Sequence, residues 1–368
     1  MKNDEKIEKV FEKMFESGQS VKGNGRPWSE RTSQTYASVC KAYANWLENT
    51  YGIADIMKSK PRHAYEYFEL KLRDVENGNA SAWTASRFPH ALHALSEGSK
   101  SSGVYQRKLK LGNKRVMLTE KNERNIERVS TDSKTLKATS DEFRAVIEKI
   151  ESSRSPNATV VAKIHTCQRS LGLRITESLD LKKSSVTFNT DGTMTVRIKG
   201  KGGLVRYVTT NDEKTKRIMR EHTQNKKSGA PIFQIKDKNG NDMGKAAGRK
   251  TLIDNIRRAA LKAGVDRDGK KYTTHSGRKV FAQERMNEYV SRDERALTRE
   301  IEKRCKSDAD IKRKYNRTMN NIKNKVSPGK RSERTMTHKE MCQFLTSTDL
   351  GHGRLDVIRY YCDYPNKK

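Results

Sequence analysis

Four short motifs in the second half of the chain carry side chains that could do chemistry: GLRITESLDL, KGKGGLVR, THSGRKVF and LGHGRLDVIRYY. They contain two arginines, a lysine, two histidines and a tyrosine, namely Arg174, Lys201, His275, Arg278, His352 and Tyr361. Guanidinium groups bind oxyanions through bidentate charged hydrogen bonds, imidazole and ammonium groups transfer protons, and a tyrosine hydroxyl becomes nucleophilic beside cations or a base. Each residue alone has an ordinary structural explanation, so the order and spacing of the set decide the interpretation.

In order and spacing, these motifs resemble the tyrosine recombinase, or phage integrase, family. In that family an arginine is followed by a lysine on a β-hairpin, a His-x-x-Arg, a histidine or tryptophan, and a tyrosine nine positions further on. His352 and Tyr361 are nine positions apart, which selects Tyr361 over Tyr360 as the nucleophile. Residues 29–101 resemble the family's core-binding domain, and residues 136–361 resemble its catalytic domain. The resemblance implies an enzyme that breaks and rejoins duplex DNA through a 3′-phosphotyrosyl intermediate.

The resemblance also implies a role for each residue of the set. Arg174 and Arg278 would hold the non-bridging oxygens of the scissile phosphate, where negative charge builds up in the transition state. His275 would take the proton of the tyrosine, and His352 would help to bind and orient the phosphate. Lys201, on a glycine-flanked turn, would give a proton to the leaving 5′ oxygen.

Residues beside the motifs are expected to support the site. Glu177 lies one helical turn after Arg174 and would orient either Arg174 or His275. Tyr360 and Tyr364 are expected to pack rather than react. The residues near the motifs that are predicted to contact the DNA phosphate backbone are Arg206, Lys279 and Arg354.

No cofactor and no metal are expected. A 3′-phosphotyrosine conserves the energy of the phosphodiester, so religation needs neither ATP nor a metal ion. The sequence accordingly has no Walker loop, no clustered Asp/Glu set of the two-metal type and no C-x-x-C pair among its five cysteines.

Three alternatives remain open at this stage. A catalytically silent DNA-binding regulator could use the same scaffold, although the presence of all six residues argues against loss of catalysis. A type IB topoisomerase would share the nucleophile but would relax DNA without sequence preference. An RNA-binding protein should carry aromatic platforms on its strands, where this sequence offers Phe188 and Tyr207.

The charge of the chain favours a polyanionic partner. Its 77 Lys+Arg against 45 Asp+Glu give a formal net charge of +32, which would cause strong self-repulsion unless a polyanion shares the surface. The charge is spread along the whole length rather than concentrated in one amphipathic helix, which favours nucleic acid over a membrane. No signal peptide and no apolar run of roughly 18 residues is present, so we expect a cytoplasmic, nucleoid-associated prokaryotic protein.

The expected fold is mainly α with a small antiparallel β-sheet (α+β). Apolar residues at helical spacing predict an amphipathic helix at 4–16. In the helical domain that follows, the third helical segment is expected to break at Pro89. Two antiparallel strand pairs are expected, with turns at Asp191-Gly192 and Gly200–Gly203. The expected parts are an N-terminal helix and linker at 1–28, an all-helical core-binding domain at 29–107, a connector at 108–137, and a tyrosine-recombinase catalytic domain at 138–368, which begins at a capping box of Thr139 and Glu142.

Arg278 and His352 are 74 positions apart, a longer separation than a compact catalytic domain needs. This separation predicts a basic helical insertion at about 288–337, which is either a solvated loop or a dedicated contact with DNA or a subunit. Its residues predicted to bind DNA are Lys312, Arg313 and Lys314.

The partners implied by the resemblance are macromolecular. We expect double-stranded DNA, a homotetramer assembled on two DNA sites from monomers or weak oligomers, and an accessory protein that sets the direction of recombination. No membrane partner is expected. The biological role would be integration or excision of a mobile element such as a phage.

Overall fold

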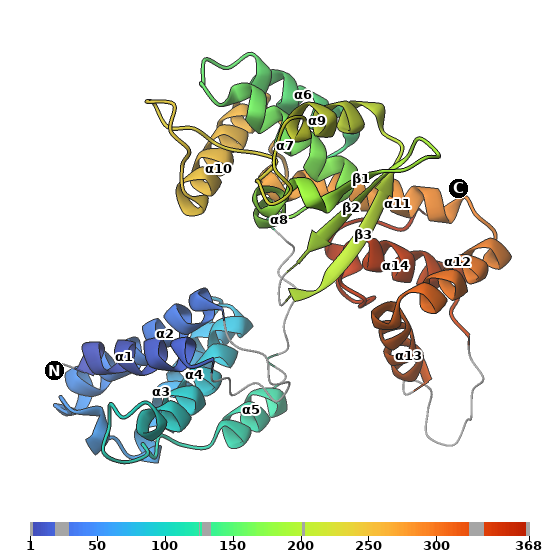
Figure 1. The fold of residues 1–368 in the computed structure, drawn as a ribbon. Helices are drawn as coiled ribbons and strands as arrows, with labels where there is room; N and C mark the ends of the chain where they lie inside the picture. Colours follow the sequence, from blue (N-terminus) through green and yellow to red (C-terminus); the bar gives the residue numbers. More distant parts are fainter. Residues whose placement is uncertain are drawn as a thin grey trace. The chain divides into compact units, whose positions relative to one another are not determined.

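The structure is a computed structural model that describes residues 3–18, 29–124, 126, 134–200, 203–323 and 335–365. The chain forms two compact units, Met1–Thr131 and Asp132–Lys368, each with its own hydrophobic core (Figure 1). Within the described ranges, every helix is too short or too polar to cross a membrane.

The first unit is all helical in its described residues. Its α-helices are α1 (Asn3–Glu16), α2 (Glu30–Tyr51), α3 (Pro61–Glu76), α4 (Ala82–Ser101) and α5 (Lys114–Glu123). The amphipathic helix predicted at 4–16 is α1, and its buried residues are Ile7, Val10, Phe11 and Met14. These side chains pack on α2 and α4, so the apolar stripe is covered within its own unit.

Two elements of this unit differ from the sequence-based expectation. The segment 108–137, expected to be a connector, contains α5, which is capped by Asn113 and packs on α3 and α4 through the buried Met117. Helix α4 also continues through Pro89. The prolyl ring removes one backbone hydrogen bond, and burial of neighbours such as Phe88 and Leu92 offsets that loss.

The second unit combines helices with one three-stranded sheet, which confirms the expected mainly α fold with a small antiparallel sheet. Its elements are α6 (Ser140–Glu151), α7 (Ala158–Leu171), α8 (Ile175–Asp180), β1 (Val186–Phe188), β2 (Met194–Lys199), β3 (Val205–Thr210), α9 (Glu213–Thr223), α10 (Lys245–Lys262), α11 (Thr274–Val290), α12 (Glu294–Ser307), α13 (Ala309–Lys323) and α14 (His338–Asp349), with a final short 3₁₀ turn, η4 (Ile358–Tyr360).

The strands form because apolar residues alternate along them. Met194, Val196 and Ile198 of β2 are fully buried, whereas Tyr207 of β3 is 64% exposed. Both strand pairs are antiparallel in the order β1-β2-β3, and Val196 lies opposite Val208. The predicted strands and the Thr139–Glu142 capping box at the start of α6 are therefore confirmed.

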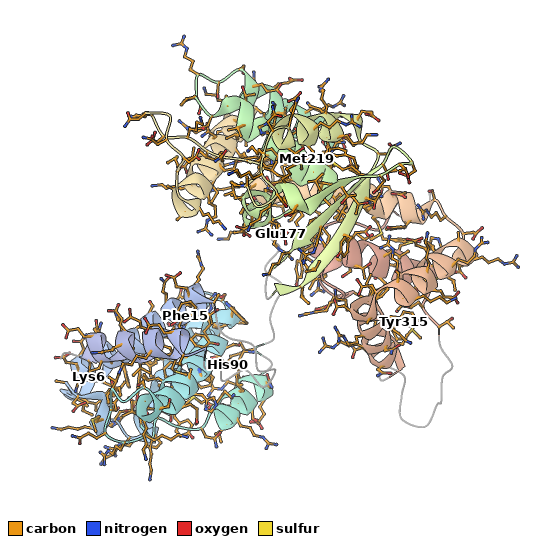
Figure 2. All side chains as sticks on the ribbon, in the orientation of Figure 1. Lys6, Phe15, His90, Glu177, Met219 and Tyr315 are labelled. Carbon is orange, nitrogen blue, oxygen red and sulfur yellow. The ribbon has the colours of Figure 1, made fainter. Side chains whose placement is uncertain are left out.

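The predicted basic helical segment contains α12 and α13. Leu297 and Ile301 of α12 are buried, and α12 packs on α14. Tyr315, labelled on α13 in Figure 2, meets Phe344 of α14 edge to face with ring centroids 5.9 Å apart. These helices are thus packed parts of the second unit. Residues 324–334 of the segment lie outside the described residues.

Candidate active site

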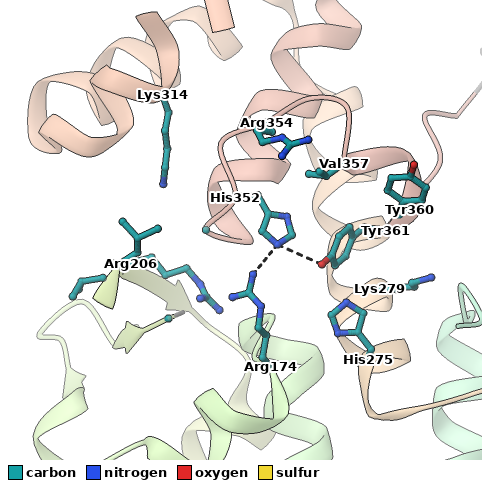
Figure 3. Close-up of a pocket in the computed structure, with 14 residues that line it drawn as sticks. Arg174, Arg206, His275, Lys279, Lys314, His352, Arg354, Val357, Tyr360 and Tyr361 are labelled. Atoms are coloured by element: carbon teal, nitrogen blue, oxygen red, sulfur yellow. Dashed lines mark hydrogen bonds between the residues drawn. The ribbon is translucent and has the colours of Figure 1, made fainter. Parts of the chain in front are cut away.

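A pocket of about 550 Å³ in the second unit brings residues of all four motifs together (Figure 3). Its lining includes Arg174, His275, His352 and Tyr361. Arg278 lies behind this lining, fully buried, with its guanidinium carbon 5.8 Å from the centre of the Tyr361 ring. The predicted Lys201 lies outside the described residues.

The loop between α14 and η4 positions His352 and Tyr361. After α14 the chain turns at Gly351, whose φ of +75° is a conformation that glycine adopts without strain. The hydroxyl of Ser347, on α14, then fastens the loop, since it donates to the carbonyl oxygen of Arg354 at 2.8 Å and accepts from the Arg354 amide at 3.0 Å. The amide of His352 donates to the Ser347 carbonyl. The loop is therefore held at both sides of His352.

Three hydrogen-bonding groups converge on one nitrogen of His352. Its Nε2 lies 2.7 Å from Nη2 of Arg174, 3.3 Å from Nη2 of Arg278 and 3.4 Å from the hydroxyl of Tyr361. A guanidinium group can only donate, so Nε2 accepts and the neutral imidazole carries its hydrogen on Nδ1. Nδ1 is buried without a hydrogen-bond partner among the described residues. Burial, followed by the charges of Arg278 and Arg174, lowers the pKa of His352 to about 3.

His275 faces the same tyrosine from the start of α11. Its ring centre is 5.2 Å from that of Tyr361, compared with 4.9 Å for His352. Burial, then the charges of Arg278 and Lys279, lower the pKa of His275 to about 3. Both imidazoles are therefore neutral at pH 7 and able to accept a proton. An anion in the pocket would raise both pKa values because it would offset the arginine charges.

Glu177 is the buried anion that organises the arginines. Its carboxylate accepts from the backbone amide and side chain of Arg174, and from both terminal nitrogens of Arg206 at 3.1 and 2.9 Å. Arg278 lies 3.7 Å away as a further ion pair. Burial raises the pKa of Glu177, but the hydrogen bonds and charge of Arg206, with the charges of Arg278 and Arg174, outweigh it and hold this pKa at about 2. The carboxylate thus orients Arg174 rather than His275.

The side chain of Arg278 is fully buried, and its guanidinium group binds backbone carbonyl groups. Its guanidinium donates to the carbonyl oxygens of Gly172 and Leu350. Burial, followed by the charges of Arg174 and Arg206, lowers its pKa to about 9. Its Nε has no hydrogen-bond partner among the described residues. Arg278 therefore supports His352 and the chain around it.

Two residues predicted as DNA-backbone contacts are internal instead. Arg206 is only 9% exposed, because its guanidinium binds Glu177 and the carbonyl of Gly172. Lys279 is 2% exposed and donates to the carbonyl of Thr135 at 2.6 Å. The third, Arg354, is well exposed and pairs with Asp356 at the pocket rim. The sequence did not reveal the buried carboxylate opposite Arg206, and a contact of Arg206 with DNA stays a prediction.

The insertion residues predicted to bind DNA separate into two groups. Lys312 and Arg313 are exposed on α13 away from the pocket lining, whereas Lys314 lines the pocket itself. No motif connects Lys314 with the other site residues, so spacing alone gave no sign of its place there.

The electrostatics of the pocket suit an anion. Among its described lining residues, the charged side chains are all basic, namely Arg174, Arg206, Lys279, Lys314 and Arg354. Their charges are focused in a hollow that excludes part of the solvent, which strengthens the attraction for a phosphate.

The fold and this site are similar to those of tyrosine recombinases. Residues 137–294 match the model of the phage integrase family. No curated protein matches the chain in sequence.

Solved structures of similar fold include the site-specific recombinase XerH. Its post-cleavage complex with palindromic difH substrate has a TM-score of 0.53 and 16% identity, over 97% of this chain and 85% of that one. The pre-cleavage XerH complex with difH has a TM-score of 0.50 and 17% identity over the same shares.

Proposed function

We propose that the protein is a site-specific recombinase that breaks and rejoins duplex DNA with Tyr361 as its nucleophile. The observation that carries the proposal is the convergence of the Tyr361 hydroxyl and an Arg174 nitrogen on Nε2 of His352, in a pocket whose charged lining is basic. The family match supports the reaction class, and the complexes of XerH with difH support duplex DNA as the partner.

The reaction follows from these residues. A phosphate entering the pocket attracts Arg174, whose Nη2 leaves His352 for a non-bridging oxygen. The Tyr361 oxygen then forms a bond to phosphorus while the bond from phosphorus to the 5′ oxygen breaks. The tyrosine proton passes to an imidazole, and the 5′ oxygen takes up a proton, for which Lys201 remains the predicted donor. Reversal with another 5′ hydroxyl rejoins the strand, without a cofactor.

His352 is the better placed proton acceptor in this conformation, because the Tyr361 hydroxyl already lies 3.4 Å from its Nε2. The expectation that His275 is the base stays a prediction. Comparing single-turnover cleavage by His275→Ala and His352→Ala separates the two. The variant of the true base should lose most of its rate at pH 7 and regain part of it at higher pH, where the Tyr361 hydroxyl ionises without a base.

Finer features belong to the same proposal. A homotetramer on two DNA sites would exchange strands during integration or excision of a mobile element, with an accessory protein setting direction. An enzyme with this substrate would act at the nucleoid, in the cytoplasm of a prokaryotic cell.

The decisive experiment traps the intermediate. A nicked suicide duplex carrying the end of the element that encodes the protein is incubated with wild type, Tyr361→Phe and Tyr360→Phe, and the products are separated on a denaturing gel. We expect a covalent adduct from wild type and Tyr360→Phe and none from Tyr361→Phe. Tight, specific binding without an adduct from wild type would instead establish a silent DNA-binding regulator.

A further inference from the structure

Helix α13 places a lysine in the active-site pocket. Lys314 extends from α13 toward the space between Arg206 and His352, as Figure 3 shows, and its side chain is 17% exposed. It shares the pocket with Tyr361. The lysine comes from the segment between the His-x-x-Arg motif and the nucleophile loop, which lies outside the four motifs.

The stem of Lys314 lies directly on the nucleophile loop. Gly353 has a φ of +72°, and a Cβ placed on it would lie 2.6 Å from Cγ of Lys314 and 3.0 Å from its Cβ. Carbon atoms do not approach that closely, so a side chain at this position would displace the lysine. Gly353 stands between His352 and Arg354, so Lys314 is seated against the loop that positions the reacting groups.

Packing fixes the helix that carries the lysine. Tyr315 contacts Phe344 of α14, and Thr318 and Ile322 of α13 are both 5% exposed. The position of Lys314 is therefore set by the core of the second unit.

The ammonium group of Lys314 forms an ion pair that a phosphate could replace. Its Nζ lies 2.8 Å from Asp310, one turn earlier on α13, and Asp310 is 27% exposed. Partly exposed ion pairs of this kind contribute little to stability and are readily exchanged. Asp310 also pairs with Arg313 at 3.1 Å, so it keeps a partner if Lys314 turns away. A phosphate diester would offer Lys314 a charge-assisted hydrogen bond in a more enclosed place.

We propose that Lys314 binds a phosphate of the DNA at the nucleophile, so that the inserted helices supply one residue of the active site. The inference rests on the proposed function for its substrate and extends it to a residue outside the six family positions. On entry of DNA, the ammonium exchanges Asp310 for a non-bridging phosphate oxygen and stabilises the charge that develops during attack by Tyr361.

The test uses single-turnover cleavage of the suicide duplex at saturating DNA. Lys314→Met keeps the stem on Gly353 and removes the charge, and we expect adduct formation to slow by about 10- to 100-fold, the usual effect of one charge-assisted hydrogen bond. Lys314→Arg should restore part of the rate. Lys303→Met, which removes an exposed lysine of α12, should stay within about twofold of wild type.

A second variant separates a phosphate contact from a structural one. Asp310→Asn releases the lysine without removing it, so its cleavage rate should equal or exceed that of wild type. A loss as large as that of Lys314→Met would show that the ion pair merely supports α13 and would overturn the inference. Equal rates for Lys314→Met and Lys303→Met would overturn it too. Absence of an adduct from wild type would instead refute the proposed function.

Discussion

Arg206 and Arg278 donate hydrogen bonds to the same atom, the carbonyl oxygen of Gly172. This residue ends α7 with a φ of +58°, and helix ends carry partial negative charge on their unpaired carbonyls. The two arginines come from β3 and α11, and both also face Glu177. A helix end and one carboxylate thus hold together two cations that would otherwise repel each other.

Replacement of the shared carboxylate should therefore destabilise the whole unit. We expect Glu177→Gln to lower the free energy of unfolding by about 3–5 kcal/mol, because it leaves buried arginines without their counterion. Urea unfolding measures the change. Glu148→Gln, which alters an exposed glutamate of α6, is the matched control and should change stability by no more than about 0.5 kcal/mol. Similar losses in both variants would contradict the role assigned to Glu177.

Arg206→Lys distinguishes an internal arginine from a DNA contact. Lysine cannot reproduce the paired hydrogen bonds to Glu177, so cleavage should slow about 10-fold or more. The dependence of DNA affinity on salt should nevertheless stay unchanged, since no phosphate contact is lost. Arg354→Gln, at the exposed rim, should reduce the logarithmic salt slope by about 1. A reduced slope for Arg206→Lys would restore the original expectation of a backbone contact.

The two depressed histidine pKa values predict acid sensitivity of the protein without DNA. Between about pH 6.5, near the unfolded value, and about pH 3, the folded value, the unfolded state binds protons that the folded state does not. Stability should therefore fall as pH falls through this window, by up to about 1.4 kcal/mol per pH unit for each histidine. Urea unfolding from pH 7 to pH 4 should give a shallower decline for His275→Asn than for wild type; an unchanged decline would contradict the burial of this imidazole.

The contact between the inserted helix and the nucleophile loop predicts coupling between two substitutions. Gly353→Ala should lower stability by about 1–3 kcal/mol through its positive φ and its clash with Lys314. Adding Lys314→Ala should recover the part that is due to the clash. A double-mutant cycle from urea unfolding measures the coupling, and strictly additive effects would show that α13 does not press on the loop.

The sequence predicted those helices and strands whose formation depends on residues close together in the chain. The stripe of α1, the capping box of α6 and the strands around Asp191-Gly192 all depend on residues close in the chain. The order and spacing of the motifs also predicted a set of site residues. Four of them, Arg174, His275, His352 and Tyr361, line one pocket.

The sequence did not predict features that depend on contacts between residues far apart in the chain. The burial of Arg206 follows from Glu177, 29 positions earlier, and the place of Lys314 follows from the packing of α13 on α14. The continuous α4 depends on a core that tolerates Pro89. None of these contacts leaves a periodic or motif-like mark in the chain.

The seating of Lys314 on Gly353 has an evolutionary consequence. The two positions should vary together among descendants of a common ancestor: a lineage that loses the inserted helices, or the lysine, is released from the need for glycine at position 353. Lineages with any other residue there should in turn have drifted away from lysine at position 314. Covariation between these positions would thus record when an added segment became part of an older catalytic centre.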